Sequence, residues 1–348
     1  NGIVLKFFGQ FLEVQKSIVH NTKIAHKYQK RIQPALTAKR VHALSFVFSI
    51  ISCGLHYAKT ALCFLLNDVI PPKKSTFYKL QKKVINVLCC LACESMNKEA
   101  SKTRSSDVIS VDGARDHWRG GTECQAVFIN QRTDKIVYVN LVTKQHGKVV
   151  GNFSGASGNM ESEAIRRAVP QLKKMSFGGY EHDKDNRTKK IFSDNWKELD
   201  EYLDPKHAKK SLERLFEKYN TNNLLYGLKQ RLIKWFYTII KLDVSPKKAK
   251  DLWKNAEQHF CGHHKKCPPH KSSNFKWPNK NNKTAVKNLH DFLDKTSETI
   301  QKVTYNYSTN TNESFNSLRT KYADKNTAWQ GRYRGRLAAS ILQKNNPY

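Results

Sequence analysis

Three carboxylates, far apart in the sequence, stand where they could bind divalent metal ions. Asp112 closes a short β-branched run and precedes Gly113, Asp183 ends a second strand-like run, and Glu313 lies near the start of a helix-like stretch. A catalytic pair of Mg²⁺ or Mn²⁺ ions requires hard oxygen ligands brought together from separate elements. The three residues are therefore candidate catalytic residues and metal ligands of a site that cuts phosphodiesters.

Neighbouring carboxylates compete for two of these positions. Asp116 follows Asp112 by four residues, but Asp112 is the one that ends the strand-like run. Asp185 and Asp194 are alternatives to Asp183, and Asp194 follows an apolar pair that could itself end a strand. The sequence favours Asp183, with Asp185 and Asp194 as alternates.

The elements that must position these side chains alternate in type along the chain. Period-two, β-branched segments predict strands, whereas apolar residues at helical spacing predict helices. We predict strands at 108–112, 124–130, 136–143, 176–182 and 199–203, and helices at 160–175, 186–196 and 206–219. Three strands joined by short turns form an antiparallel meander. With the helices and strands that follow, they predict an α/β sheet with helices on its faces.

The flanking segments read as helical, which predicts four parts. Residues 1–105 form a helical domain, 106–219 the first part of the α/β core, 220–305 a helical insertion with a Cys/His loop, and 306–348 the C-terminal helical part of the core. Within the first part, 40–52, 56–67 and 75–90 are apolar-periodic, and Ser75 is a candidate N-cap. The third stretch is lysine-rich. The domain is thus either a helix-turn-helix module for DNA binding or dimerisation, or an ordinary helical subdomain.

The charge of the chain points to a polyanionic partner. Lysine and arginine number 61 against 29 acidic residues, a formal net charge of +32. Excess charge of this size most often serves nucleic-acid binding, and we expect double-stranded DNA. No apolar run is long enough for a membrane span. Trp277 is the candidate for stacking on bases. The candidate DNA-contacting residues are Lys73, Lys74, Lys79, Lys265, Lys266, Arg332 and Arg334.

Cysteine and histidine usage suggests free thiols and one further metal site. The eight cysteines include Cys89, Cys90 and Cys93 in an apolar run, which predicts buried free thiols in a reducing compartment, the cytosol or the nucleus. The loop 259–270 holds six possible zinc ligands. Cys261 and His264, or His263 and Cys267, have workable spacing for structural Zn²⁺, and the candidate ligands are Cys261, His264 and Cys267. His263 is the alternative to His264, and His259 or His270 could complete the set. The alternative is a metal-free basic loop that contacts DNA.

The ordered motifs resemble those of the DDE transposases, specifically the Mutator-like and Kolobok-like group. Their first Asp ends the first strand, as in Ser110-Val-Asp112-Gly, and their second ends the fourth strand before a short helix, as in His182-Asp183. A signature of Cys or Asp, two residues, then His follows, as in Asp204-Pro-Lys-His207. The last carboxylate stands in a motif like Asn312-Glu313-Ser-Phe-Asn316. The intervals also fit: 71 residues from 112 to 183, and 130 from 183 to 313.

This resemblance implies a ribonuclease-H-like core and a specific chemistry. The enzyme would be a DDE-type DNA transposase of the nucleus that cuts the ends of a DNA element and joins them to a target. It would use two Mg²⁺ or Mn²⁺ ions held by Asp112, Asp183 and Glu313, and act on DNA as a homodimer or larger assembly. Two alternatives share the fold: a domesticated, non-catalytic DNA-binding protein and a structure-specific nuclease.

Overall fold

The computed structural model describes most of the chain. The described residues are 44, 46–51, 53–66, 70–116, 121–145, 150–264, 267, 277–303, 307–327, 329 and 332–346. Residues 40–43, 45 and 52 of the predicted stretch 40–52 lie outside these ranges, as do Lys265, Lys266 and His270. Among the described residues, none of the helices combines the length and apolar character that crossing a bilayer requires.

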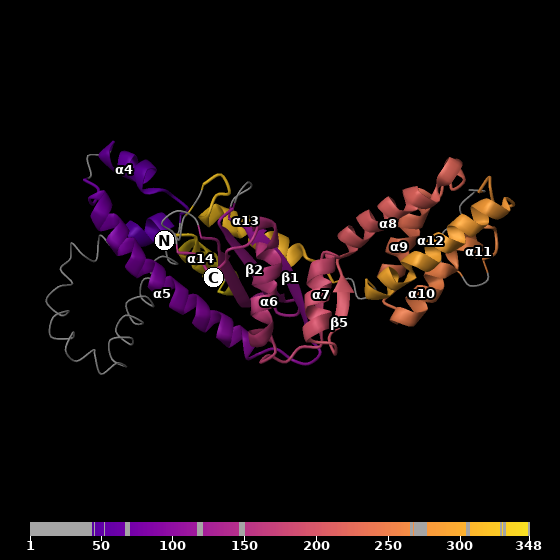
Figure 1. Cartoon of the computed structure of the whole chain (residues 1–348), viewed down its shortest axis with the longest axis horizontal. Coiled ribbons are helices and arrows are strands. Elements are labelled where there is room, and N and C mark those ends of the chain that lie inside the picture. Colours follow the sequence, from indigo (N-terminus) through magenta and orange to yellow (C-terminus); the bar gives the residue numbers. More distant parts are fainter. Residues whose placement is uncertain are drawn as a thin grey trace. The chain divides into compact units, whose positions relative to one another are not determined.

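A mixed five-stranded sheet confirms the predicted α/β class (Figure 1). Its strands are β1 (Val108–Arg115), β2 (Glu123–Asn130), β3 (Lys135–Thr143), β4 (Gly179–His182) and β5 (Asp200–Leu203). They lie in the order β3-β2-β1-β4-β5. β2 and β3 are antiparallel, whereas β1 with β4 and β4 with β5 are parallel. All five predicted strands are present, with ends that differ by at most three residues.

The chain forms two compact units. The first comprises 1–104, 113–176 and 311–348, and the second comprises 105–112 and 177–310. The segment that we predicted as a helical insertion, 220–305, lies wholly in the second unit.

Long helices build the first unit around β2 and β3. Its helices are α4 (Tyr57–Leu65), α5 (Lys74–Ala100), α6 (Met160–Leu172), α13 (Asn310–Tyr322) and α14 (Tyr333–Asn345). α5 and α14 pack together and both contact β3, while α6 contacts β2 and β3. The helix predicted at 75–90 is confirmed as part of α5, but its end and the Ser75 cap were wrong, because α5 has 27 residues and no side-chain cap. That length spans about 40 Å and suits a scaffold helix.

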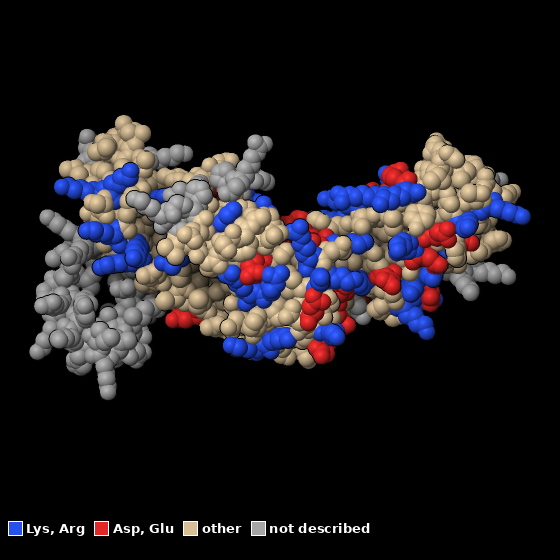
Figure 2. Space-filling model, viewed as in Figure 1, with Lys and Arg blue, Asp and Glu red and all other residues tan. Residues whose placement is uncertain are grey.

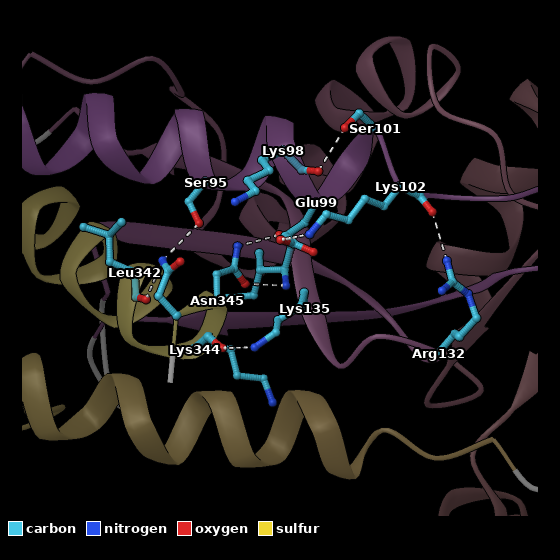
Figure 3. Close-up of polar contacts among 12 residues, drawn as sticks. Ser95, Lys98, Glu99, Ser101, Lys102, Arg132, Lys135, Leu342, Lys344 and Asn345 are labelled. Atoms are coloured by element: carbon cyan, nitrogen blue, oxygen red, sulfur yellow. Dashed lines mark hydrogen bonds and ion pairs between the residues drawn. The ribbon is translucent and has the colours of Figure 1, made fainter. Parts of the chain in front are cut away.

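Polar contacts join the C-terminal end of α5 to the β2–β3 turn, and polar contacts also join α14 to β3 (Figure 3). The side-chain amide of Asn345 accepts from Ile136 N at 2.8 Å and donates to Ile136 O at 2.9 Å, as a neighbouring strand would. Arg132 reaches back to the carbonyl of Lys102 at 2.9 Å. Because β3 is an edge strand, the pairing of Asn345 with Ile136 satisfies backbone groups that could otherwise hydrogen-bond to a strand of another chain.

The thiols of α5 differ from the prediction. Cys90 and Cys93 are exposed and Cys89 is half-buried, whereas Cys124 on β2 is buried. Because this run is almost wholly apolar, its sequence does not indicate which helix face is buried. The buried face of α5 includes Leu88 and Ala92. The cysteines at positions 53, 89, 90, 93, 124, 261 and 267 are free.

The second unit adds a helical core beside β4 and β5. Its helices are α7 (Asn186–Asn195), α8 (Pro205–Tyr219), α9 (Lys229–Lys241), α10 (Pro246–Lys254), α11 (Ala256–Phe260) and α12 (Lys283–Lys302). Trp253 is fully buried among them, and its indole N–H donates to Thr296 Oγ1 at 2.9 Å. Trp277 also lies in this core and is 1% exposed. Its predicted role in base stacking was therefore wrong, because packing against α-helices removes the ring from solvent.

Candidate functional site

The register of the parallel strands brings Asp112 and Asp183 together. The last pair of β1 with β4 is Ser110 with Glu181, and the Ser110 hydroxyl donates to Glu181 Oε2 at 2.6 Å. Asp112 and Asp183 each stand two residues beyond that pair. Side chains two residues apart point to the same face of a strand, and neighbouring strands lie about 4.8 Å apart. The two aspartates therefore lie just beyond the β1–β4 pairing, Asp112 within β1, which continues to Arg115, and Asp183 directly after β4.

Glu181 shows how strongly negative charge is concentrated here. The residue is fully buried, and burial raises the pKa of its carboxyl group to about 8. The hydrogen bond from Ser110 lowers this pKa only in part, and the charges of Asp204, Asp183 and Asp112 raise it further. Burial thus favours the protonated, uncharged form of Glu181. Sequence reasoning missed it, although a glutamate inside a buried strand is itself an unusual signal.

One oxygen of Asp183 is buried without a hydrogen-bond partner. Its Oδ2 lies 3.4 Å from Nε2 of His207, while among the described residues nothing donates to Oδ1. Burial raises the pKa of Asp183, against the opposing charge of His207 and a hydrogen bond from Thr309. Buried polar atoms almost always have partners, so an unpartnered carboxylate oxygen in a polar setting calls for a ligand. A hard cation fits this donor.

Asp204 explains one half of the Asp-x-x-His signature. It is fully buried and is the N-cap of α8, where its Oδ1 accepts from the backbone N–H groups of Lys206 at 2.8 Å and His207 at 3.0 Å. Its Oδ2 accepts from Thr309 N at 3.0 Å, Thr309 Oγ1 at 3.2 Å and Ser308 Oγ at 3.3 Å. A single carboxylate therefore starts α8 and ties down the residues that precede α13.

His207 explains the other half. A residue three positions after the N-cap lies in the first turn of the helix. From there the imidazole of His207 reaches Asp183. The spacing of the signature thus follows from helix geometry: the aspartate caps, and the histidine one turn later faces the end of β4.

The alternate carboxylates have capping or exposed positions. Asp185 is the N-cap of α7, and its Oδ2 accepts from Thr188 N at 2.9 Å and Thr188 Oγ1 at 3.0 Å. Asp194 is exposed near the end of α7, away from any strand end. Asp116 is buried, and its Oδ1 accepts from Glu123 N at 3.1 Å. Local hydrogen bonds thus account for Asp185 and for Oδ1 of Asp116, whereas Oδ1 of Asp183 has no partner among the described residues.

Glu313 lies in the first turn of α13 and is exposed. The buried face of this helix consists of Asn312, Phe315 and Arg319, and Arg319 Nη1 donates to the Tyr333 hydroxyl at 2.7 Å. That face leaves the Glu313 side chain in solvent. Asp112 and Asp183 belong to the second unit, and Glu313 belongs to the first.

A second carboxylate that the sequence analysis missed is Glu161, in the first turn of α6. A Cβ at Gly113 would lie only 2.1 Å from Cγ of Glu161. The glycine after Asp112 therefore leaves space for the Glu161 side chain within β1.

The predicted DNA-contacting residues fall into two groups. Lys73, Lys74 and Lys79 are exposed at the start of α5. Arg332 lies 5.2 Å from the ring centroid of Tyr78, and Arg334 Nη2 donates to Asn86 Oδ1 at 3.1 Å. Both arginines thus also help α14 and its preceding residues pack on α5.

A row of basic side chains along α8 was missed. Figure 2 shows blue side chains gathered along this helix. Lys206, Lys210, Arg214 and Lys218 are all exposed and recur every four residues, so they share one helix face. The row begins next to His207. The signal was present in the sequence as basic residues at helical spacing.

Glu201 on β5 forms ion pairs in the second unit whose contribution to stability depends on pH. Its carboxylate contacts Lys302 Nζ at 2.6 Å and His182 Nε2 at 3.2 Å. Burial by itself would raise the pKa of Glu201, but hydrogen bonds and charge from His182 and Lys302 outweigh it and lower the pKa to about 2. A group with a depressed folded-state pKa stabilises the protein above its unfolded pKa and loses that contribution as the pH falls.

We therefore expect Glu201→Gln to lower the free energy of unfolding at pH 7 by on the order of 1–2 kcal/mol, allowing for solvent screening. The difference from the wild type should shrink as the pH falls from about 4.5 toward 2. Urea unfolding at a series of pH values measures it. Glu217→Gln is a matched control, since Glu217 pairs with Lys229 at the surface. A deficit that stays constant from pH 7 to 3 would contradict this account.

Comparison with models of protein families finds no match, and no curated protein matches the chain significantly. The residues and their geometry therefore carry the functional conclusion.

Proposed function

We propose that this chain is the catalytic core of a DNA transposase with a ribonuclease-H-like fold. The observation that carries the proposal is the register of β1 with β4, which sets Asp112 and Asp183 each two residues beyond the Ser110–Glu181 pair, with His207 against Asp183. The strand order β3-β2-β1-β4-β5 supports the fold assignment. It matches the expected core of a three-strand meander followed by two strands that are each reached through a helix.

The donor set suits a pair of Mg²⁺ ions held by Asp112, Asp183 and Glu313. Carboxylate oxygens are hard ligands, and Oδ1 of Asp183 is buried without a partner among the described residues. Bound Mg²⁺ would lower the pKa of an attacking water or DNA 3′-hydroxyl and stabilise the leaving oxygen. His207 would hold Asp183 in one orientation through its contact with Oδ2.

Chain connectivity supports Glu313 as the third ligand. Asp204 fixes Thr309 at the carboxyl end of β5, which pairs with β4. Glu313 follows Thr309 by four residues, about 6 Å along a helix axis. Thr309, the residue directly before α13, is thus tied to the residue that follows β5.

Strand joining separates the proposed transposase from its rivals. The substrate is the genomic DNA that flanks the coding sequence on both sides, because a cut-and-paste element carries its own ends. The full chain in Mg²⁺ should cut this DNA and join labelled pre-cut ends with a free 3′-hydroxyl to a plasmid. A nuclease would cut without joining. A domesticated DNA-binding protein would bind without either reaction, and either result would overturn the proposal. We expect a homodimer or larger assembly on DNA.

The basic row on α8 should contribute to DNA affinity. We expect binding to weaken steeply with salt, because each neutralised phosphate releases condensed counterions and adds about 0.9 to the slope of log K against log salt. Replacing Lys210, Arg214 and Lys218 together with alanine should reduce that slope by up to about three. Fluorescence anisotropy with a duplex at several salt concentrations measures it.

Lys173→Ala with Lys174→Ala is the matched control, since both residues are exposed basic side chains of the first unit. That pair should leave the slope nearly unchanged. An unaltered slope in the α8 variant would remove α8 from the interface, and a flat salt dependence of the wild type would contradict nucleic-acid binding altogether.

A further inference from the structure

Three possible metal ligands converge in the second unit, outside the carboxylate site. They are Nδ1 of His259 at the end of α11, Nδ1 of His264 and Sγ of Cys267, and all lie within 4.8 Å of one another. The two nitrogens are 3.0 Å apart. The sulfur lies 3.3 Å from His259 Nδ1 and 3.8 Å from His264 Nδ1.

These separations match one face of a tetrahedral zinc site. With Zn–N bonds of about 2.0–2.1 Å and Zn–S bonds of about 2.3 Å, neighbouring ligand atoms are about 3.3 to 3.6 Å apart. The three observed distances bracket that range. We propose that His259, His264 and Cys267 bind one Zn²⁺ ion. Three protein ligands leave one tetrahedral position, which water can occupy.

The surrounding side chains hold the ligands in place. The His259 ring stacks on Trp235 of α9, with centroids 4.7 Å apart, and meets Phe260 edge-on at 5.0 Å. Asn255, which ends α10, donates from Nδ2 to Cys267 Sγ at 3.6 Å. Hydrogen bonds of this kind orient a ligand and tune its basicity. Three successive helices therefore support the cluster.

The ligand set differs from the one predicted from spacing alone. Cys261 was expected as a ligand, yet its sulfur is not among the converging atoms, and Cys261 packs against the helical core of the second unit. His259 takes its place because α11 carries this histidine on the side that faces Trp235. The proposed ion would fasten the chain after α11 to α9 and α10, so it has a structural role.

Metal content and spectroscopy of the full chain test the proposal. Purified protein should hold about one Zn²⁺ per chain by mass spectrometry. Reconstitution with Co²⁺ should produce a thiolate-to-metal charge-transfer band. Cys267→Ser should abolish that band, whereas Cys261→Ser, the matched control, should retain it. Likewise His264→Asn should lose the metal and His263→Asn should keep it.

Affinity measured against a chromophoric chelator adds a finer readout. Asn255→Ala should weaken Zn²⁺ binding by about 10- to 100-fold, as expected for loss of a supporting hydrogen bond. This variant leaves all three ligands in place, so the test survives if a ligand variant fails to fold. Wild-type protein that gives no charge-transfer band with Co²⁺ would overturn the proposal. So would equal zinc affinity in Cys267→Ser and Cys261→Ser, which would identify the cluster as hydrogen-bonded side chains only.

Discussion

Replacing Asp183 with asparagine should slow DNA cleavage by roughly a thousandfold or more, because a bound metal contributes several kcal/mol of transition-state stabilisation. The amide has the same shape as the carboxylate but lacks its charge. It therefore keeps the packing at the end of β4 while losing the ligand that the buried Oδ1 offers. DNA affinity should change little, since phosphate contacts come from basic side chains. Single-turnover cleavage in Mg²⁺ and fluorescence anisotropy measure the two effects.

The neighbouring carboxylates are built-in controls. Asp185→Asn should retain cleavage, because asparagine caps a helix as well as aspartate does. Glu181→Gln should also retain most activity at neutral pH, since burial raises the pKa of Glu181 to about 8 and so favours the uncharged form that glutamine mimics. Asp112→Asn and Glu313→Gln should match the loss in Asp183→Asn. Cleavage that survives Asp183→Asn and disappears in Asp194→Asn would show that the second aspartate was misassigned.

The strands and their carboxylates could be predicted because their signals are local. Alternating β-branched residues mark β1, β2 and β3. A polar residue directly after such a run marked the end of β4 at Asp183, but the same prediction for Asp112 was wrong, because β1 continues to Arg115. The pairing of β1 with β4 could not be derived this way, because register depends on contacts between segments about 70 residues apart. The role of Asp204 was hidden for the same reason. Its partner Thr309 lies 105 residues away.

Packing overrode local composition elsewhere. α5 continues to Ala100 because residues such as Val84 and Leu88 are buried in the core that α14 also builds, so the polar segment after residue 90 stays helical. Trp277 stands in a lysine- and asparagine-rich stretch typical of a surface, yet the helical core of the second unit takes up its ring. Sequence composition reports what a segment can do, whereas tertiary contacts decide which of its side chains reach solvent.

Asp204 should prove more important for stability than an ordinary helix cap. Asp204→Ala should lower the free energy of unfolding by about 3–4 kcal/mol, because it removes the cap of α8 and leaves buried donors of Ser308 and Thr309 unsatisfied. Ser245→Ala is the matched control in the same unit. Ser245 caps α10 by accepting from Lys248 N at 3.4 Å, without hydrogen bonds to a distant segment like those of Asp204. We therefore expect Ser245→Ala to lower the free energy of unfolding by about 1 kcal/mol. Urea unfolding followed by circular dichroism measures both variants.

The variant Asp204→Asn separates the N-capping of α8 from the hydrogen bonds that Asp204 accepts from Thr309. Its oxygen can still accept from Lys206 N and His207 N, but its amide group cannot accept from Thr309. If Asp204 positions the start of α13, this variant should cut DNA much more slowly while binding it normally, and Thr309→Val should add little further loss. Ser245→Ala should cleave at the wild-type rate. Cleavage at the wild-type rate by a well-folded Asp204→Asn protein would show that N-capping is the only role of the aspartate in the Asp-x-x-His signature. The hydrogen bonds from Thr309 to Asp204 would then not be needed to position Glu313.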